Sequence, residues 1–394
     1  MNSKIEPKLR HSLLLIGPKT GETVMGVSVA FDLLSDYLKE IGGKTKEVNL
    51  TQSGAASTAG RFRWGRMGFT VARVVESWFK MLTVSSVYLI VFTSVLGFIK
   101  DFLVILVAWL LRKKIIVHLH GGGYRLFYEQ QSPFRQRIIR WTLRRTARII
   151  VLGELLRNQF DFLDAPELIV VVPNGMAHPT GSQSMVAKQA PTKDEPWRCL
   201  YLSNLMETKG YYVLLEAAEL LCANQAYNFQ IDFCGGFIES SAESGSATRA
   251  TQLQADFNHK VNENPLNKFV TYHGTVGGTK KEKLLENAHV LILPTWYPWE
   301  GQPLSIIEAM ACGTPVIGTR HAGIPEEIVH QETGWMLENG QIDKEHLSKL
   351  LSDMMNMSSG EYSKMSQQAY QFYLDHFTKE KHLDNLLTVI NSVN

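Results

Sequence analysis

Residues 289–318, HVLILPTWYPWEGQPLSIIEAMACGTPVIG, combine a strand, a loop, a helix and a second strand. The first strand is the apolar run at 289–293, the helix spans 303–312, and the β-branched run at 315–318 forms the next strand. Buried strands that are joined by a helix run parallel, because a parallel pair needs a crossover connection. The stretch therefore predicts an α/β unit.

The same alternation of buried strands and helices continues through the rest of the chain. We expect further strands at 12–16, 87–93, 115–119, 148–152, 168–172, 198–203, 229–234 and 269–273. The length of 394 residues exceeds the roughly 250 to 300 at which a single core stops growing. We therefore expect two Rossmann-like domains, each with a parallel sheet.

The domain boundaries follow from a change in composition. Residues 176–197 are polar, contain proline and lack apolar periodicity, which is typical of a linker. We expect an N-terminal domain at 1–175, a C-terminal domain at 198–376, and a last helix at 377–394 that returns to the first domain. Ligands of such sheets bind beyond the carboxyl ends of the strands, so we expect the site in a cleft between two facing domains.

The composition indicates a globular, reduced, intracellular chain. The four cysteines occur singly in apolar runs, and no signal peptide is evident. Residues 84–111 are almost wholly apolar, but Lys100 and Asp101 leave pieces shorter than the ~20 residues that a spanning helix needs. We interpret this stretch as a buried strand followed by a buried helix.

The net charge of +2 hides an uneven distribution. Residues 1–175 contain 24 Lys and Arg against 13 Asp and Glu, whereas residues 176–394 contain 16 against 25. This polarity predicts that the first half faces an anionic partner. Nucleic acid is not favoured, because no zinc-finger spacing, aromatic RNA-binding signature or long basic arm occurs. An anionic membrane surface fits better.

Two basic segments account for the charge of the first half. Residues 60–81 interleave cations with large apolar side chains, which is typical of a membrane interface. The residues that we assign to acceptor and membrane contact are Arg61, Arg63, Trp64, Arg66 and Phe69. Residues 135–148 add six arginines and no acid. Four of these arginines have helical spacing, which fits either membrane contact or a solvated helix face.

The helix at 303–312 begins with an anion-binding pattern. Gly301 permits a tight turn, and Pro303 suits the first helical position, where its missing N–H would be unpaired anyway. The N–H groups of Leu304 and Ser305, with the helix dipole behind them, form a site for an anion such as a phosphate.

Two glutamates flank this turn. Glu308 lies one helical turn after Leu304, and its carboxylate can accept hydrogen bonds from a vicinal diol such as a ribose. Glu300, at the tip of the loop, can reach hydroxyls of a group beyond the phosphate. The alternative is that Glu300 caps the helix and Glu308 is a solvated helical position.

Residues 289–340 resemble the donor-binding segment of the family-4 retaining glycosyltransferases, two-domain enzymes of the GT-B fold that use nucleotide sugars. The core EGQPLSIIEAM, the strand GTPVI and the helix start AGIPE occur in the family's order. The resemblance extends to VVPNG at 171–175 and to LYLSNLMETKGYYVLLEAAELL at 200–221. It covers nearly the whole chain from residue 12, although the region 50–85 is individual.

The resemblance implies roles for single residues. Glu300 contacts hydroxyls of the donor sugar, Glu308 the ribose, and Lys209 the diphosphate, whose departing charge an ammonium group neutralises. Gly301 and Gln302 belong to the same donor-binding set.

One position departs from the family pattern. Asn204 stands where many members have an arginine, five positions before Lys209. Either another cation supplies the charge, with Arg320 and Lys19 as candidates, or donor binding is weaker.

The first domain contributes two further candidate sites. Gly17 and Gly26 lie in a glycine-bearing loop, which either lets backbone amides approach the diphosphate or is a simple flexible turn. His118 and His120 lie on the same side of a strand. By resemblance, His120 lies near the transferred sugar, whereas we expect His118 to be a hydrogen-bonded structural residue.

These observations predict a retaining glycosyltransferase that moves a sugar from a nucleoside diphosphate sugar to a saccharide acceptor, possibly a lipid-diphosphate-linked one, in polysaccharide assembly. We expect neither a metal nor a cofactor, and a location at the cytoplasmic face of the membrane. A nucleotide-sugar epimerase of the same architecture and a catalytically weak nucleotide-sugar-binding protein are the alternatives. The sequence does not identify the base, the sugar or the acceptor.

Overall fold

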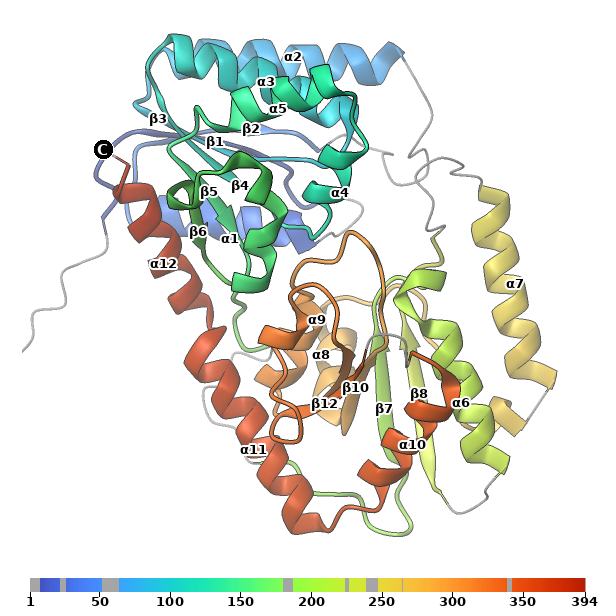
Figure 1. Cartoon of the computed structure of the whole chain (residues 1–394). Coiled ribbons are helices and arrows are strands. Elements are labelled where there is room, and N and C mark those ends of the chain that lie inside the picture. The colour runs from blue at the N-terminus through green and yellow to red at the C-terminus, as the bar shows by residue number, and fades with distance from the viewer. Residues whose placement is uncertain are drawn as a thin grey trace, which may run out of the picture. The chain divides into compact units, whose positions relative to one another are not determined.

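The computed structural model describes residues 8–21, 26–51, 64–179, 187–223, 227–238, 247–263, 265–338 and 342–393. The chain divides into two compact units (Figure 1). Unit 1 comprises Met1–Asn174 and Lys379–Asn394, and unit 2 comprises Gly175–Thr378. Residues 187–197, which the sequence assigns to a linker, belong to unit 2, where the backbone N–H of Lys188 donates to Ser366 Oγ at 2.9 Å.

Unit 1 is a parallel sheet with helices on both faces. Its elements, with 3-10 helices written η, are β1 (Leu13–Gly17), α1 (Gly26–Glu40), β2 (Thr45–Asn49), α2 (Trp64–Met81), β3 (Ser86–Ile90), α3 (Val95–Leu110), β4 (Lys114–His118), α4 (Tyr124–Glu129), α5 (Pro133–Leu143), β5 (Arg148–Val151), η2 (Glu154–Leu163), η3 (Pro166–Leu168), β6 (Ile169–Val171) and α12 (Lys379–Asn391). The strand order is β2-β1-β3-β4-β5-β6. Helices α2, α3 and α5 lie together on one face of the sheet, with α1 on the other (Figure 1).

Helix α12 completes the core of unit 1. Leu383, Leu386 and Ile390 of α12 belong to the same buried cluster as Phe31 and Leu34 of α1. The side chain of His382 is buried as well, and its Nδ1 donates to the carbonyl oxygen of Pro173 at 2.5 Å. The last helix is therefore a structural part of the first unit.

Unit 2 has the same layered design. Its elements are β7 (Trp197–Leu202), η4 (Glu207–Lys209), α6 (Tyr211–Ala223), β8 (Phe229–Cys234), α7 (Ala247–Glu263), η5 (Pro265–Lys268), β9 (Val270–Tyr272), α8 (Gly278–Asn287), β10 (Val290–Leu293), α9 (Leu304–Ala311), β11 (Val316–Thr319), η6 (Ile324–Glu326), β12 (Gly334–Leu337), α10 (Lys344–Met355) and α11 (Ser359–His376). All strand pairs are parallel, and the order is β12-β11-β10-β7-β8-β9. The prediction of two Rossmann-like domains with parallel sheets is confirmed.

Several predicted elements differ in the structure. The helix expected to start at AGIPE, residues 322–326, is only the short η6. Strands β2 and β12 were not predicted. The stretch 84–111 forms the buried strand β3 as expected, but α3 is not a buried helix, because one of its faces is exposed. No helix among the described residues has both the length and the apolar character to cross a membrane.

Candidate functional site

The predicted donor residues gather where the order of the second sheet reverses. Strand β7 lies between β10 and β8, so the connections that follow β7 and β10 leave the sheet in opposite directions. Such a reversal at the carboxyl ends of parallel strands is where open α/β sheets bind ligands. Lys209 follows β7, and Glu300 follows β10. The topology therefore brings the two predicted catalytic residues of this unit to one point.

A glycine sets the position of Lys209. Lys209 ends η4, and Gly210 follows it with φ +74° in the left-handed region. A Cβ atom at Gly210 would lie 2.1 Å from the carbonyl oxygen of Pro294, just after β10. Only glycine fits both this conformation and this approach. The close packing holds Lys209 against the loop that carries Glu300.

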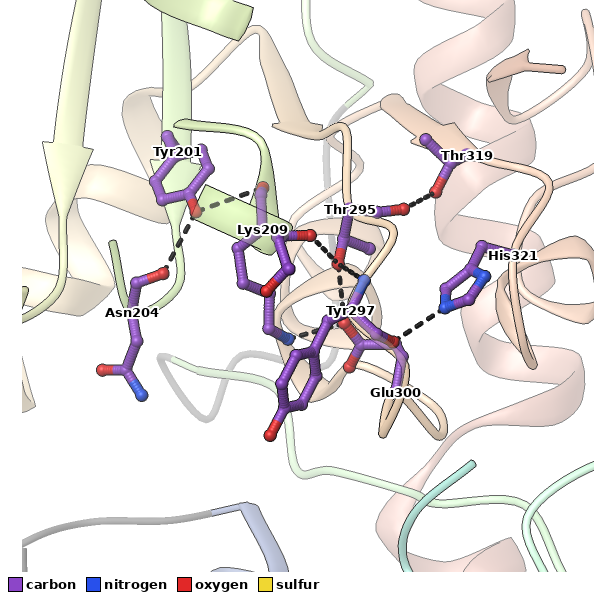
Figure 2. Close-up of polar contacts among 9 residues, drawn as sticks. Tyr201, Asn204, Lys209, Thr295, Tyr297, Glu300, Thr319 and His321 are labelled. Atoms are coloured by element: carbon purple, nitrogen blue, oxygen red, sulfur yellow. Dashed lines mark hydrogen bonds and ion pairs between the residues drawn. The ribbon is translucent and has the colours of Figure 1, made fainter. Parts of the chain in front are cut away.

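Lys209 and Glu300 form a buried ion pair (Figure 2). Lys209 Nζ lies 2.6 Å from Glu300 Oε2, and the Thr295 hydroxyl donates to the same oxygen at 3.2 Å. The ammonium also lies 5.0 Å from the centre of the Tyr297 ring. Glu300 is not a helix cap in this arrangement, because its carboxylate binds the lysine.

Side chains that bond to backbone carbonyl oxygens hold both sides of this pair in place. The Tyr201 hydroxyl donates to the carbonyl oxygens of Asn204 and Lys209. On the opposite side, His321 Nε2 donates to the carbonyl oxygen of Tyr297 at 2.7 Å (Figure 2). The site loop is thus tied to the segment after β11 as well as to β7.

The start of α9 differs in one detail from the prediction. Pro303 is the N-cap residue, with φ −65° and ψ 116°, and the helix begins at Leu304. The first N–H groups of a helix have no intrahelical acceptor, so the amides of Leu304 and Ser305 lie where an anion could bind, and their contact with an anion stays a prediction. Gly301 and Gln302 are buried beside them.

Glu308 is bound to a lysine that the sequence did not indicate. Glu308 lies on α9, is buried, and accepts from Lys281 Nζ of α8 at 2.6 Å. It is therefore not a solvated helical position. A carboxylate has room for several hydrogen bonds, so Glu308 can hold Lys281 and a diol together.

The structure shows where the candidate cations lie that could replace the arginine missing at position 204. The side chain of Asn204 is exposed and reaches neither Lys209 nor Glu300 (Figure 2). Arg320 Nε binds Glu338 at 2.8 Å, and Lys19 binds Glu47 in unit 1. Among the described residues of unit 2, two lysines contact a predicted donor carboxylate: Lys209 binds Glu300, and Lys281 binds Glu308.

A third glutamate of this region lies fully buried. Glu327 follows η6, and neither of its carboxyl oxygens has a hydrogen-bond partner among the described residues. Burial raises its pKa well above the usual value, and the nearby charge of Glu300 adds to the shift. Burial thus favours the uncharged form of the Glu327 carboxyl group.

In unit 1, the two predicted histidines stack on each other. The rings of His118 and His120 have centres 3.9 Å apart, and Tyr88 Oη lies 2.5 Å from His118 Nδ1. The structural role expected for His118 is confirmed by this bond. Burial lowers the pKa of His120 to about 3, so this imidazole is neutral. Its predicted contact with the sugar stays a prediction.

The glycine loop and the membrane residues are described in part. Gly17 is buried, and a Cβ there would lie 2.5 Å from the Phe31 ring, so this glycine lets α1 pack on β1. Gly26 begins α1 and is exposed. Arg61 and Arg63 lie outside the described residues.

Of the other membrane candidates, Trp64 and Arg66 belong to the backbone of α2, and Phe69 is half-buried beneath the Arg73 guanidinium at 5.2 Å. In the arginine stripe, Arg144 donates to the carbonyl oxygens of Leu163 and Asp164 and therefore has a structural role.

Among the described residues, no group of three or more His, Cys, Asp and Glu side chains forms a potential metal site. The expectation that donor binding needs no metal stays a prediction.

Comparison with curated proteins places the site in a known domain type. Residues 184–372 match the family model described as Glycosyl transferases group 1. A region of 171 residues is 29% identical to the amylovoran biosynthesis glycosyltransferase AmsK of Erwinia amylovora, covering 42% of this chain and 37% of that protein. A region of 167 residues is 28% identical to the D-inositol 3-phosphate glycosyltransferase of Corynebacterium jeikeium, covering 41% and 37%. The chain thus aligns with little more than a third of the length of each of these relatives.

Solved structures extend the similarity to the whole fold. HepE of Anabaena in complex with UDP has a TM-score of 0.68 and 13% identity, covering 97% of this chain and 100% of that one. Sucrose-phosphate synthase of Thermosynechococcus elongatus has a TM-score of 0.70 and 17% identity, covering 97% and 99%. These similarities confirm the predicted GT-B fold. Residues 184–372, which hold Lys209, Glu300 and Glu308, thus resemble a group 1 glycosyltransferase domain.

Proposed function

We propose that the protein transfers a glycosyl group, with retention at the anomeric carbon, from a nucleoside diphosphate sugar to a saccharide acceptor. The observation that carries this proposal is the Lys209–Glu300 pair at the sheet reversal, next to the first amides of α9. A cation and free amides suit a diphosphate, and a carboxylate suits sugar hydroxyls.

In this proposal the donor replaces one partner of the ion pair. The diphosphate takes the place of the Glu300 carboxylate at Lys209 Nζ. Glu300 is then released to accept hydrogen bonds from the sugar, while Glu308 keeps Lys281 and accepts from the ribose. The charges that pair with each other in the structure thus become the charges that recognise the donor.

The reaction breaks the bond between the anomeric carbon and the diphosphate oxygen and forms a bond to the acceptor oxygen on the same face. The acceptor proton passes to the departing diphosphate. Lys209 and the amides of Leu304 and Ser305 stabilise the negative charge that develops on this leaving group. Positioning of the two reactants supplies the rest of the rate enhancement.

We assign the acceptor to a saccharide on a lipid diphosphate at the cytoplasmic face of an anionic membrane. The excess of cations in residues 1–175 supports this assignment. The similarity to AmsK, a glycosyltransferase of amylovoran biosynthesis, supports a role in polysaccharide assembly.

The proposal is tested by screening the purified protein against a panel of nucleotide sugars. Thermal shift reports binding, and release of nucleoside diphosphate with and without saccharide acceptors reports reaction. Lys209→Met should lower turnover by about 10²- to 10³-fold, because it removes the charge opposite the leaving group. Lys283→Met, an exposed lysine of α8, is the control and should keep wild-type turnover.

Three outcomes would contradict the proposal. Binding without release or transfer indicates a nucleotide-sugar-binding protein, and an epimerised sugar formed without acceptor indicates an epimerase. Wild-type turnover in Lys209→Met would show that Lys209 does not stabilise the leaving diphosphate.

A further inference from the structure

Helix α3 exposes its apolar side chains and buries its charges. Leu96 and Leu110 are 70% and 63% exposed, whereas Lys100 and Asp101 are only 7% and 2% exposed. The two buried charges form an ion pair, with Lys100 Nζ 2.5 Å from Asp101 Oδ1. A helix on the surface of a globular domain normally exposes its charges and buries its apolar side chains. The exposed apolar face of α3 therefore marks a contact surface.

The outward residues of α3 follow helical spacing. They form an apolar stripe at alternating intervals of three and four residues, in which Leu96, Ile99 and Leu110 are exposed and Leu103 and Leu106 are half-buried. The neighbouring helices extend this surface. Phe79 of α2 is 70% exposed and Phe134 of α5 is 73% exposed, and both helices pack beside α3 (Figure 1).

The charge of this layer is positive. Helices α2, α3 and α5 together contain two acids, Glu76 and Asp101. Both are ion-paired within the layer, Glu76 with Arg73 and Lys80. Among the described residues, the exposed cations at or next to these helices include Arg112, Lys114, Arg135, Arg137 and Arg140.

An arginine and two tryptophans lie at the junction of α3 and α5. The Arg145 guanidinium lies 3.5 Å from the centre of the Trp141 ring and 4.9 Å from that of Trp109, and the two indole rings meet edge to face. Tryptophan and arginine side chains, with an apolar body and a polar end, are enriched at the boundary between lipid and water.

We propose that the outer face of α2, α3 and α5 seats in the headgroup region of an anionic bilayer. The apolar stripe reaches the acyl boundary, and the exposed arginines and lysines contact lipid phosphates. This inference deepens the proposed function, in which the acceptor lies at the membrane, by assigning the contact to a surface centred on α3. A second copy of the chain is a poorer occupant, because it would bring like cations together.

The test is flotation of the whole protein with vesicles of phosphatidylcholine, with or without phosphatidylglycerol. The wild type should float with the anionic vesicles, and higher salt should weaken binding. The triple variant Leu96→Gln/Ile99→Gln/Leu110→Gln should bind at least about tenfold more weakly, because it removes apolar area from the contact. Leu220→Gln, at an exposed leucine of α6 in unit 2, should bind as the wild type does.

A second variant guards against misfolding of the first. Arg135→Glu/Arg137→Glu keeps the apolar stripe and should also lose binding to anionic vesicles. Wild-type flotation of both variants, or no flotation of the wild-type protein, overturns the inference. So does a dimer in light scattering that becomes a monomer in the triple variant, because the occupant is then a second copy.

Failure of the proposed function has a separate readout. Slow hydrolysis of the nucleotide sugar, measured without lipid, should be equal in the wild type and the triple variant. Flotation without any hydrolysis or transfer would contradict the transferase and leave the membrane surface standing. Hydrolysis without flotation would contradict the membrane surface and leave the transferase standing.

Discussion

Lys281 and Lys283 lie on the same short helix, but they have different surroundings. Lys281 binds the buried carboxylate of Glu308, whereas Lys283 is exposed. Lys281→Met should raise the KM for the donor about tenfold with little change in kcat, because Glu308 loses the partner that orients it in the ground state and the transition state alike. Lys283→Met should leave both constants unchanged. A fall in kcat at constant KM in Lys281→Met would contradict a role in donor binding.

Glu327 predicts a stability effect that depends on pH. Burial raises its pKa in the folded state, so its contribution is complete below the unfolded value of 4.5 and is lost as the pH rises towards the folded pKa. Glu327→Gln, which cannot ionise, should therefore raise the Tm at pH 8, and the gain should vanish near pH 4.5.

Thermal denaturation from pH 4.5 to 8 measures this difference. Glu332→Gln, at an exposed position of the same segment, is the control and should show no such trend. A Glu327→Gln protein that is less stable than the wild type at pH 8 would mean that the carboxyl group is charged and bound in the fold.

The sequence singled out a site residue only where the residue belongs to a recognisable local pattern. The loop and helix around Glu300 and Glu308 are contiguous in the sequence, so the local pattern and the family resemblance singled out both residues. Lys281 precedes Glu308 by 27 positions and has lysines on either side within three residues. Glu327 lies in a run that reads as a polar helix start. Nothing local distinguishes these side chains, because their surroundings come from other elements.

At the scale of elements, the turn between η4 and α6 decides where Lys209 lies. Gly210→Ala should destabilise unit 2 by roughly 2–4 kcal/mol and lower kcat, because the added Cβ meets the Pro294 carbonyl in addition to the strain of φ +74°. Gly274→Ala is a matched control, since Gly274 has φ +67° but open space around it. Its cost should be about 1 kcal/mol, with turnover unchanged.

Urea unfolding and steady-state kinetics on the two variants test this prediction. Equal losses at Gly210 and Gly274 would show that backbone strain alone matters and that the packing against Pro294 does not position the lysine.

The strands that the sequence analysis missed are both at sheet edges. β2 and β12 each pair with one neighbour only. The sequence of β2, TKEVN, is polar because most of its side chains are partly exposed, and the short β12 begins with a glycine. Central strands, covered on both faces, carry continuous apolar runs and were found. The error at α3 has a different cause. An apolar run predicts burial away from water, and in the proposed bilayer contact it is lipid that withdraws the exposed face of α3 from water.

At the scale of the whole molecule, unit 1 should be the more acid-sensitive part. The pKa values of three histidines, the buried His118 and His382 and the half-buried His120, lie below the usual 6.5. Desolvation lowers the pKa of His120 to about 3 and that of His382 to about 4. Their contribution to stability is complete above pH 6.5 and is lost as the pH falls through these values. Each proton taken up on unfolding costs about 1.4 kcal/mol per pH unit.

Denaturation at pH 7.5 and pH 5, followed by hydrogen exchange of each unit, measures this effect. Helices α1 and α12 should lose protection at pH 5 before α6 and α9 do. His382→Gln should reduce the pH dependence, because glutamine can still donate to the carbonyl of Pro173 without binding a proton. An unchanged slope in this variant would exclude His382 from the effect.

The return of α12 to unit 1 has a consequence for biogenesis. Residues Gly175–Thr378 form one uninterrupted segment, whereas the core of the unit encoded first still lacks its final helix when that segment has been translated. A nascent chain can thus finish the later unit before the earlier one. Until α12 is made, the apolar side chains of α1 that it covers stay exposed and can bind chaperones. Ribosome-arrested chains that end at Thr378 should therefore bind chaperones more than the released full-length protein does.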